Sequence, residues 1–415
     1  MSKNLKKAYH TIVEDHFPDR MEIAFVFDDR RQTLIYEKVR WDVDGMRQGL
    51  RYGENPGQEA ALYRLINGNL ALGGVTTIEP GRYLVSNVEL LQAGKHPGKI
   101  NLTDADNALN ILRYLGDRPA AAVMKHNNPA GVAIAESIAE AYVRADLADH
   151  LAAFGGCVAL NRPVDKATAE AISARYAEVV VAPAYEVGTI EILAQRKNLR
   201  ILRIDNMARL TAFAPERVVD FKSLIDGGVI AQLSFQPRTR THEDLMLAET
   251  TRKGTTYRIE REPTEREIED MLFGWMVEAG VTSNSVLYVK DLVTVGIGAG
   301  EQDRVGAAEI ARNKAYRNLA ERYAYERYQT TYRFLETEQR EEIDADVQAL
   351  NGGLKGAVMV SDAFFPFRDG VDVGLREGVT AVIQPGGSIR DYQSIEACNE
   401  FGATMVYTGQ RSFKH

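Results

Sequence analysis

The sequence predicts an α/β protein, because helical and strand-like segments alternate along most of it. From about residue 102, amphipathic stretches are followed by short apolar runs, for example residues 120–124 and 157–160. Later runs such as residues 178–181 are rich in β-branched side chains, as expected of buried strands. Hydrophobic residues make up 45% of the chain and charged residues 26%, which is the balance of a soluble globular protein.

The predicted elements follow one another in a regular order. A helix over residues 1–18 and two strands, 22–27 and 32–36, come first. Each of the next four helices precedes a strand: 104–117 precedes 120–124, 136–148 precedes 157–160, 165–176 precedes 178–181, and 187–196 precedes 199–204. Further strands are predicted at 229–234, 285–289, 293–297, 357–360, 381–383 and 404–407. Further helices are predicted at 264–279, 304–336, 369–377 and 388–400.

A chain of 415 residues is too long for one ordinary core, so we expect more than one domain. We divide it into N-terminal helix and strands (1–45), a first α/β subdomain (46–205) and a second (206–415). The stretch 316–350 mixes Glu and Arg at helical spacing and predicts a solvated helical excursion of the second subdomain.

Composition excludes several classes of protein. The formal net charge of −8 argues against a nucleic-acid partner, which would favour a basic face. Only two cysteines occur, Cys157 and Cys398, and neither has ligand spacing, so we expect neither disulfides nor zinc. No apolar stretch is long enough to span a membrane, and the N-terminus lacks the apolar core of a signal peptide. We therefore expect a cytoplasmic protein without a membrane partner.

The heptad KHNNPAG (residues 125–131) directly follows the predicted strand 120–124, so Lys125 and His126 lie side by side at a strand end. The Asn-Pro pair and the glycine predict a turn after them. Strand ends that lead into turns are where α/β folds place their chemistry. A fixed cation beside a group that titrates near neutral pH suits a reaction that builds charge on a carbonyl oxygen while a proton moves. From the heptad alone, a surface lysine beside a capping histidine explains the pattern equally well.

The run GIGAG (residues 296–300) lies between a predicted strand and a predicted helix. Its spacing is GxGxG, whereas a dinucleotide fingerprint requires GxGxxG, and the preceding strands predict a hairpin and not a βαβ unit. We therefore expect no nicotinamide cofactor. We expect instead that the backbone comes close to a ligand here, with Arg304 close behind. A plain strand-to-helix turn is the alternative.

Three segments near the C-terminus carry further patterns. SDAFFPFRD (residues 361–369) has three phenylalanines in four positions and predicts an aromatic slot for a flat heterocycle, with a hydrophobic staple as the alternative. QPGGS (residues 384–388) opens a predicted helix and suits either an anion or ordinary capping by Ser388. The Arg-x-Phe-x-His ending predicts a docked tail. Asp104-x-Asp106 lacks further ligands, so we interpret it as the acids of a helix N-terminus.

Eight segments occur together in the order in which one family has them: RYGENPGQ, KHNNPAG, AFGG, SNSV, GIGAG, SDAFFPFRD, IQPGGSIRD and RSFKH. They resemble the transformylase half of the bifunctional purine enzyme, AICAR transformylase/IMP cyclohydrolase. The resemblance covers residues from about 45 to 415. Only about 45 residues precede it, so we expect a transformylase without the cyclohydrolase domain and without cyclohydrolase activity.

The resemblance implies a fold of two cytidine-deaminase-like three-layer α/β subdomains without zinc. It implies a homodimer whose active sites form at the interface. The substrate would be 5-aminoimidazole-4-carboxamide ribonucleotide (AICAR), and the co-substrate 10-formyltetrahydrofolate. The implied reaction is formyl transfer to the 5-amino group of AICAR, which gives formyl-AICAR and tetrahydrofolate in the synthesis of IMP.

Carried over to the matching positions, Lys125, His126 and Asn284 resemble the catalytic residues. The 5-amino group is a poor nucleophile because its lone pair is delocalised toward the carboxamide. A base must take its proton as it attacks the formyl carbon, and His126 suits that role. Lys125 can stabilise or protonate the oxyanion of the tetrahedral intermediate. Asn284 would hold His126 or the carboxamide in orientation.

The other carried-over residues resemble ligand contacts. Those that resemble ligands of the ribotide phosphate are Arg51, Tyr52 and Arg411. Those that resemble further nucleotide contacts are Asn101, Gly155, Arg304, Phe364, Phe413 and His415. Those that resemble the folate pocket are Leu151, Phe154, Val305, Phe367 and Asp369. Asp362 resembles a residue near a structural potassium site, which adds K+ to the expected ligands.

The chain departs from the family's pattern around the substrate. Residues 98–101 read GKIN where the family has SYNN, and residues 149–156 read DHLAAFGG where it has DPxSxFGG. Asp303 replaces a serine and puts a negative charge where the nucleotide is expected. These changes leave two alternatives open: a non-catalytic purine-nucleotide-binding regulator on the same fold, and the same transfer with a different formyl-folate donor.

Overall fold

The computed structural model describes residues 7–75 and 81–415. The chain forms two compact units, and each combines two separate segments: residues 1–109 with 157–236 (the N-terminal unit), and residues 110–156 with 237–415 (the C-terminal unit). These units do not coincide with the contiguous division at 205/206, because strands β7 (Ala120–Lys125) and β8 (Asn128–Ile134) belong to the C-terminal unit. The division into two cytidine-deaminase-like subdomains stays a prediction.

The N-terminal unit contains a small α/β sheet with the strand order β9 (Gly156–Leu160), β10 (Ala177–Ala182), β11 (Arg200–Arg203) and β6 (Glu89–Gln92). Strands β10 and β11 are parallel, and β6 joins the edge antiparallel to β11. Its helices are α2 (Lys99–Leu112), α5 (Lys166–Ser173) and α6 (Thr189–Ala194). The helices and strands predicted between residues 104 and 204 are confirmed, although α2 begins and ends five residues before the predicted bounds and an unpredicted strand, β8, follows β7 directly.

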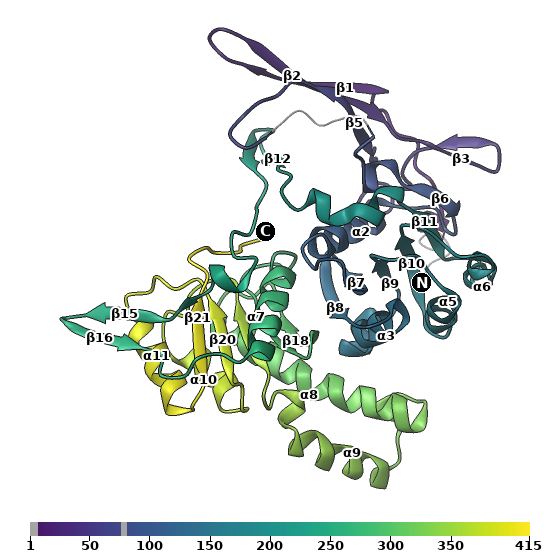
Figure 1. Ribbon diagram of the computed structural model, residues 1–415. Helices are drawn as coiled ribbons and strands as arrows, with labels where there is room; N and C mark the ends of the chain where they lie inside the picture. Colours follow the sequence, from purple (N-terminus) through teal and green to yellow (C-terminus); the bar gives the residue numbers. More distant parts are fainter. Residues whose placement is uncertain (1–6, 76–80) are drawn as a thin grey trace. The chain divides into compact units, whose positions relative to one another are not determined.

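The other strands of this unit are antiparallel (Figure 1). They are β1 (Arg20–Val26), β2 (Arg31–Lys38) and β5 (Tyr63–Gly68) in one sheet, the pair β3 (Trp41–Val43) and β4 (Met46–Gln48), and the pair β12 (Val219–Ser223) and β13 (Val229–Leu233). Of the helix predicted over residues 1–18, only residues 7 and 8 are helical in the described part of the chain, and residues 1–6 lie outside that part. Residues 11–18 have no regular structure, because their backbone bonds elsewhere: the Val13 amide donates to Arg51 and the His16 amide to Glu59.

The C-terminal unit contains a mixed sheet. Its strand order is β14 (Met246–Leu247), β21 (Thr404–Tyr407), β20 (Ala381–Gln384), β19 (Val358–Ser361), β17 (Val286–Lys290), β18 (Val293–Gly298), β8 and β7. Strands β19, β20 and β21 are parallel, whereas β17 is antiparallel to both of its neighbours. The short hairpin β15 (Glu249–Arg252) and β16 (Thr255–Arg258) lies outside this sheet.

Helices cover both faces of the sheet in the C-terminal unit. Helix α7 (Glu265–Glu278) packs so closely on one face that a Cβ on Gly274 would meet Val360 and Val289. Alternate residues such as Val286 and Tyr288 share the opposite core with α8 (Arg304–Tyr328), α10 (Asp369–Leu375) and α11 (Asp391–Glu400). Since successive residues of a strand point to opposite faces, this makes a helix–sheet–helix sandwich. The predicted α/β class is confirmed.

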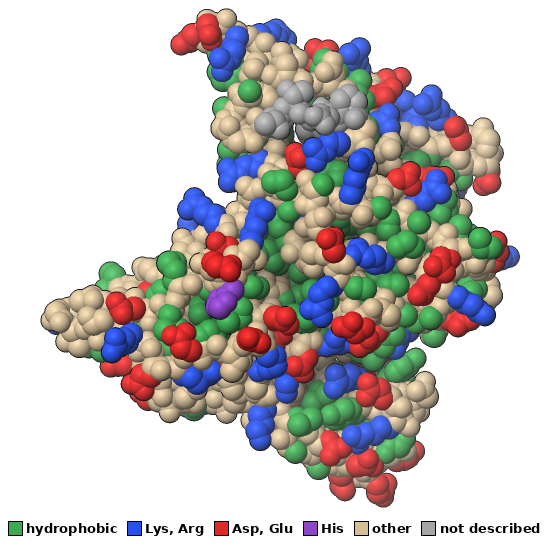
Figure 2. Space-filling model, in the orientation of Figure 1, with side chains coloured by type: hydrophobic (Ala, Val, Ile, Leu, Met, Phe, Trp, Pro, Cys, Tyr) green, Lys and Arg blue, Asp and Glu red, His purple; other side chains and the backbone are tan. Residues whose placement is uncertain are grey.

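The remaining helices are α3 (Ile138–Ala148), α4 (His150–Ala153) and α9 (Thr337–Ala349). The helix predicted over 304–336 ends at Tyr328, because Gln329 takes a left-handed conformation with φ of 53°. Acidic and basic side chains alternate over α8 and α9 (Figure 2), where Arg327 pairs with Glu342 and Asp346. Among the described residues, no helix has the length and apolarity needed to cross a membrane.

Candidate active site

The turn that follows Lys125 is tighter than the sequence predicted. His126 and Asn127 alone join β7 to β8, and both have positive φ, 53° and 61°. This is the two-residue hairpin that matches the twist of its strands. Pro129 and Gly131, which we expected in the turn, belong to β8. Gly131 is needed there because a Cβ would overlap the Ala145 carbonyl of α3.

Lys125 and His126 differ in their surroundings. Lys125 is partly buried, and its ammonium donates to the carbonyls of Phe154 (3.2 Å) and Gly155 (3.0 Å). The heptad is therefore joined to the AFGG segment after α4. His126 is exposed at the tip of the hairpin. A fixed cation and a solvent-accessible imidazole thus stand next to each other at a strand end, as the sequence predicted.

The hairpin is also joined to the SNSV segment and the C-terminal tail. The Asn128 side-chain oxygen accepts from the Thr282 amide at 2.8 Å. The Lys414 ammonium donates to the Asn127 carbonyl at 2.8 Å, and its own carbonyl accepts from the Ser283 amide at 2.9 Å. The tail is docked by main-chain bonds, which confirms the prediction for residues 408–415.

Asn284 belongs to a buried polar network. Its side-chain oxygen accepts from Arg304 Nη2 at 2.9 Å, and its amide nitrogen donates to the Glu301 carbonyl at 3.0 Å. The same Arg304 nitrogen donates to Asp362 Oδ1 at 2.9 Å. Asp362 is fully buried and accepts at Oδ2 from the Ser283 hydroxyl and from the Ser285 amide, the latter at 3.1 Å. The network fixes Asn284 close to the segment that carries the tail.

Behind this network lies an acid that sequence reasoning missed. Glu278, the last residue of α7, is fully buried and accepts from the Ser285 hydroxyl. Burial raises the pKa of this carboxyl well above 4.5, and the charge of Asp362 raises it further. The only signal in the sequence was a glutamate directly after the apolar run 271–277.

Cationic and aromatic side chains meet in the tail. The guanidinium groups of Arg304 and Arg411 lie 5.8 and 4.7 Å from the Phe413 ring centroid. The His415 ring lies edge-on to Phe413, with 5.8 Å between their centroids. Four of the expected nucleotide contacts are therefore close together in the C-terminal unit.

The expected aromatic slot contains fewer rings than the sequence suggested. Phe365 is fully buried among core residues, so only Phe364, partly buried, and Phe367, half exposed, remain accessible. The Arg390 guanidinium lies 4.2 Å from the Phe367 ring centroid. Of the other expected folate contacts, Leu151 and Phe154 are exposed beside α4, Val305 is partly buried in the first turn of α8, and Asp369 is exposed at the start of α10.

Two glycine-rich segments have structural roles. A Cβ on Gly296 or Gly298 would overlap the carbonyls of Ala311 or Ala307, so these glycines let β18 pack against α8. This packing accounts for both glycines, and the expected ligand approach at this run stays a prediction. In QPGGS, the amides of Gly387 and Ser388 donate to Asp391 at 2.8 and 3.0 Å. Their anion is a carboxylate of the chain itself, and α11 begins three residues later than predicted.

Other acids singled out in the sequence also have local partners. Asp303 is the N-cap of α8, because its carboxylate accepts from the Gly306 amide at 2.7 Å. Asp104 and Asp106 lie in the second turn of α2 and not at its N-terminus. Within the described residues, no group of three or more His, Cys, Asp or Glu side chains could hold a metal ion.

The remaining predicted residues belong to the N-terminal unit. Arg51 is buried, lies with its guanidinium carbon 4.5 Å from the Tyr52 ring centroid, and donates to the Lys95 carbonyl at 3.2 Å. Asn101, in the first turn of α2, accepts from the Gly98 amide at 3.0 Å. The GKIN segment thus begins a helix next to Arg51 and Tyr52.

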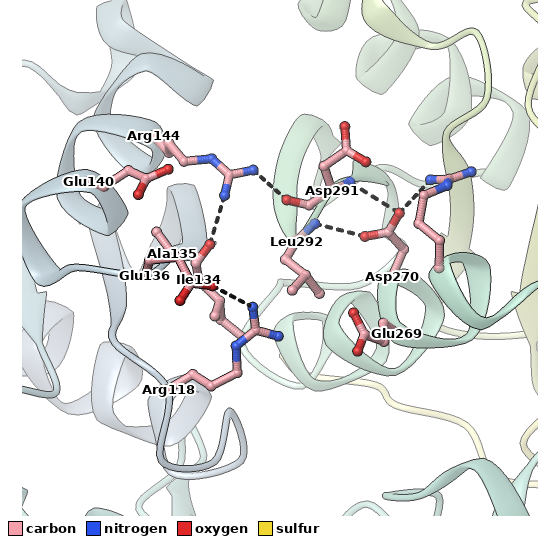
Figure 3. Close-up of a pocket in the computed structure, with 11 residues that line it drawn as sticks. Arg118, Ile134, Ala135, Glu136, Glu140, Arg144, Glu269, Asp270, Asp291 and Leu292 are labelled. Atoms are coloured by element: carbon pink, nitrogen blue, oxygen red, sulfur yellow. Dashed lines mark hydrogen bonds and ion pairs between the residues drawn. The ribbon is translucent and has the colours of Figure 1, made fainter.

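A cavity of about 240 Å3 lies at the opposite end of β8 from His126 (Figure 3). Two of its charged side chains are already paired: Asp270 accepts from the amides of Leu292 (2.7 Å) and Asp291 (3.1 Å), and Arg144 donates to the Ile134 and Asp291 carbonyls. These bonds secure the β17–β18 turn. We therefore assign the cavity a structural role.

Comparison with known proteins assigns this chain to one family. A family model described as "AICARFT/IMPCHase bienzyme" matches residues 5–314. The chain is 35% identical over 410 residues to the bifunctional purine biosynthesis protein PurH of Oceanobacillus iheyensis, covering 98% of this chain and 65% of that protein. It is 39% identical over 387 residues to PurH of Magnetococcus marinus, covering 92% of this chain and 61% of that protein. The chain thus spans less than two thirds of the length of these relatives.

Proposed function

Because the chain belongs to the AICARFT/IMPCHase family, we propose that it is an enzyme of purine biosynthesis that transfers the formyl group of 10-formyltetrahydrofolate to AICAR. One observation carries the proposal. The lysine–histidine pair, the asparagine after Ser283 and the docked tail are joined by hydrogen bonds in one unit. A histidine that can accept a proton and a lysine that can stabilise an oxyanion suit a reaction that moves a proton and builds an oxyanion.

His126 would take the proton of the 5-amino group as that group attacks the formyl carbon. Its φ of 53° belongs to the two-residue hairpin, which places the side chain at the tip of the turn. An imidazole that is exposed at a hairpin tip can reach a bound substrate. Histidine is the side chain that enzymes use most often as a general base.

Lys125 would stabilise the tetrahedral intermediate. The carbonyls of Phe154 and Gly155 hold its ammonium, so the charge is oriented before the oxyanion forms. The intermediate collapses by breaking the bond between the formyl carbon and N10 of the folate, and that nitrogen takes up a proton. Asn284, oriented by Arg304, would hold His126 or the carboxamide.

The remaining residues would bind the two ligands. We propose that Arg51, Tyr52 and Arg411 bind the ribotide phosphate, and that Arg304, Phe413 and His415 contact the nucleotide. The partly exposed apolar side chains Leu151, Phe154 and Phe367 would receive the aromatic rings of the folate. A homodimer with sites at the interface belongs to the same proposal.

The residues around Asp362 do not fit a bound potassium ion. Both carboxylate oxygens accept hydrogen bonds from the protein, and Arg304 already supplies the neutralising charge. We therefore derive no step that passes through the ion.

A rate assay tests the proposal. Purified protein should release tetrahydrofolate from AICAR and 10-formyltetrahydrofolate. His126→Asn keeps a residue that tolerates positive φ but removes the base, so the rate should fall by about 10²–10⁴-fold. His242→Asn changes an exposed histidine in the same unit and should leave the rate unchanged. A native protein that binds both ligands without turnover would refute the function.

The alternatives give different results in the same assay. A different donor isomer would support turnover where 10-formyltetrahydrofolate does not. A regulator would bind AICAR but not turn it over; the capping role of Asp303 weakens the argument for it, because that acid has a structural partner. Cyclohydrolase activity is measured separately, as IMP formed from formyl-AICAR.

A further inference from the structure

Arg51 is a buried cation that lacks an ion pair within the described parts of the chain. Only 7% of its surface is exposed. Its Nη1 donates to the Lys95 carbonyl, whereas its Nε has no hydrogen-bond partner among the described residues. A buried charge without a counter-ion is unfavourable unless a ligand supplies the opposite charge. The environment of Arg51 therefore favours an anion.

A second buried cation lies behind it. Arg200, at the start of β11, is 1% exposed and donates to the His96 carbonyl at 3.4 Å. Burial lowers the pKa of Arg200, and the charge of Arg51 lowers it further, so the two guanidinium groups repel each other. Among the described residues, Glu178 is a carboxylate whose negative charge raises the pKa of both arginines. Its carboxylate lies 3.3 Å from Arg200 Nη1.

The buried His96 joins the two arginines to the start of helix α2. Its Nε2 lies 2.5 Å from the Gly49 carbonyl, and its Nδ1 has no partner among the described residues. The Arg51 amide donates to the Pro97 carbonyl at 2.9 Å, and the Lys99 amide donates to the Tyr52 carbonyl at 3.0 Å. Arg51 and Arg200 thus hold the loop 95–98 from two sides, next to the positive end of a helix.

We propose that Arg200 is a positioning residue for an anion subsite whose direct ligand is Arg51, and that Glu178 limits the positive charge of this subsite. The ligand chemistry is a phosphate monoester. This inference rests on the proposed function in one respect: the proposed function identifies the phosphate monoester as that of the ribotide. Arg200 acts through the His96 carbonyl, which fixes the loop, and through its charge.

Three substitutions test the proposal in the full chain. Arg200→Lys keeps the charge but loses the guanidinium, whose two terminal nitrogens donate to Glu178 and to the His96 carbonyl. Inorganic phosphate should therefore bind about tenfold more weakly. Glu178→Gln removes the compensating charge, so phosphate should bind about threefold more tightly. Arg203→Gln, in the same strand but paired with Glu89 and Asp205 at the surface, is the control and should change nothing.

Binding of inorganic phosphate is measured by calorimetry, and the KM for AICAR and kcat by the transfer assay. We expect KM to follow the phosphate affinities while kcat at saturating AICAR stays constant. The opposite signs of Arg200→Lys and Glu178→Gln separate this role from a loss of folding. Equal phosphate affinities in all variants, or weaker binding by Glu178→Gln, would overturn the proposal. A native protein that shows the phosphate pattern without turnover would overturn the proposed function and not the subsite.

Discussion

Replacing Asp362 by asparagine is expected to destabilise the C-terminal unit strongly. Asp362 is fully buried, and its carboxylate accepts from Arg304, from Ser285 and from the Ser283 hydroxyl. An asparagine has one acceptor oxygen and one donor NH2 group, so at least one of these donors would face another donor. It would also leave the Arg304 guanidinium, 11% exposed, without its counter-ion.

The magnitude follows from the burial of the pair. Removing one partner of a buried ion pair costs about 3–5 kcal/mol, and each charge-assisted hydrogen bond about 1.5–3 kcal/mol. We therefore expect the free energy of unfolding to fall by about 3 kcal/mol or more. Asp346→Asn is the matched control, because Asp346 also pairs with an arginine but is 48% exposed. Its loss should cost less than about 1 kcal/mol.

Urea unfolding measures both values. Trp275 is fully buried in α7 and reports on this unit, and a Trp41→Phe background removes the other tryptophan. The double variant Asp362→Asn with Arg304→Met removes both charges, so it should regain part of the lost stability. If Asp362→Asn unfolds at the same urea concentration as Asp346→Asn, the buried network does not stabilise the unit.

Three further outcomes are expected. Glu278→Gln should gain stability relative to the unsubstituted protein as pH rises above 4.5. The pKa of Glu278 is raised in the folded state, so the unfolded chain releases this proton first. The free energy of unfolding of the unsubstituted protein therefore falls by about 1.4 kcal/mol per pH unit until Glu278 ionises in the folded state. A difference between the urea midpoints of the two proteins that is the same at pH 5 and at pH 7 would contradict this. Asp303→Ser should keep stability, because both residues cap helices, while lowering the KM for AICAR; an unchanged KM would show that the acid does not affect the nucleotide. Gly298→Ala should lose about 1–3 kcal/mol, because its Cβ overlaps a backbone carbonyl of α8, and a native urea midpoint would disprove that contact.

Local sequence patterns predicted most elements. The runs that became β7, β9, β10, β17 and β20 were evident because apolar residues continue without interruption in strands covered on both faces. The failures occurred where local signals and packing disagree. Pro129 and Gly131 indicated a turn, but Gly131 lies in β8 because α3 passes too close for a side chain. The helix predicted over residues 1–18 does not extend through residues 11–18, since the Val13 and His16 amides donate to Arg51 and Glu59 far along the chain.

The sequence by itself determined the α/β class, the adjacency of Lys125 and His126, and the order of motifs that indicates the family. These depend on neighbouring residues, which the chain order fixes. Only the tertiary structure decided that Asp362 and Glu278 would be buried together, that Arg304 would join Asn284 to Asp362, and that Gly387 and Ser388 would bind a carboxylate of their own chain. Such contacts join residues many positions apart, and their strength comes from exclusion of water, which no local pattern encodes.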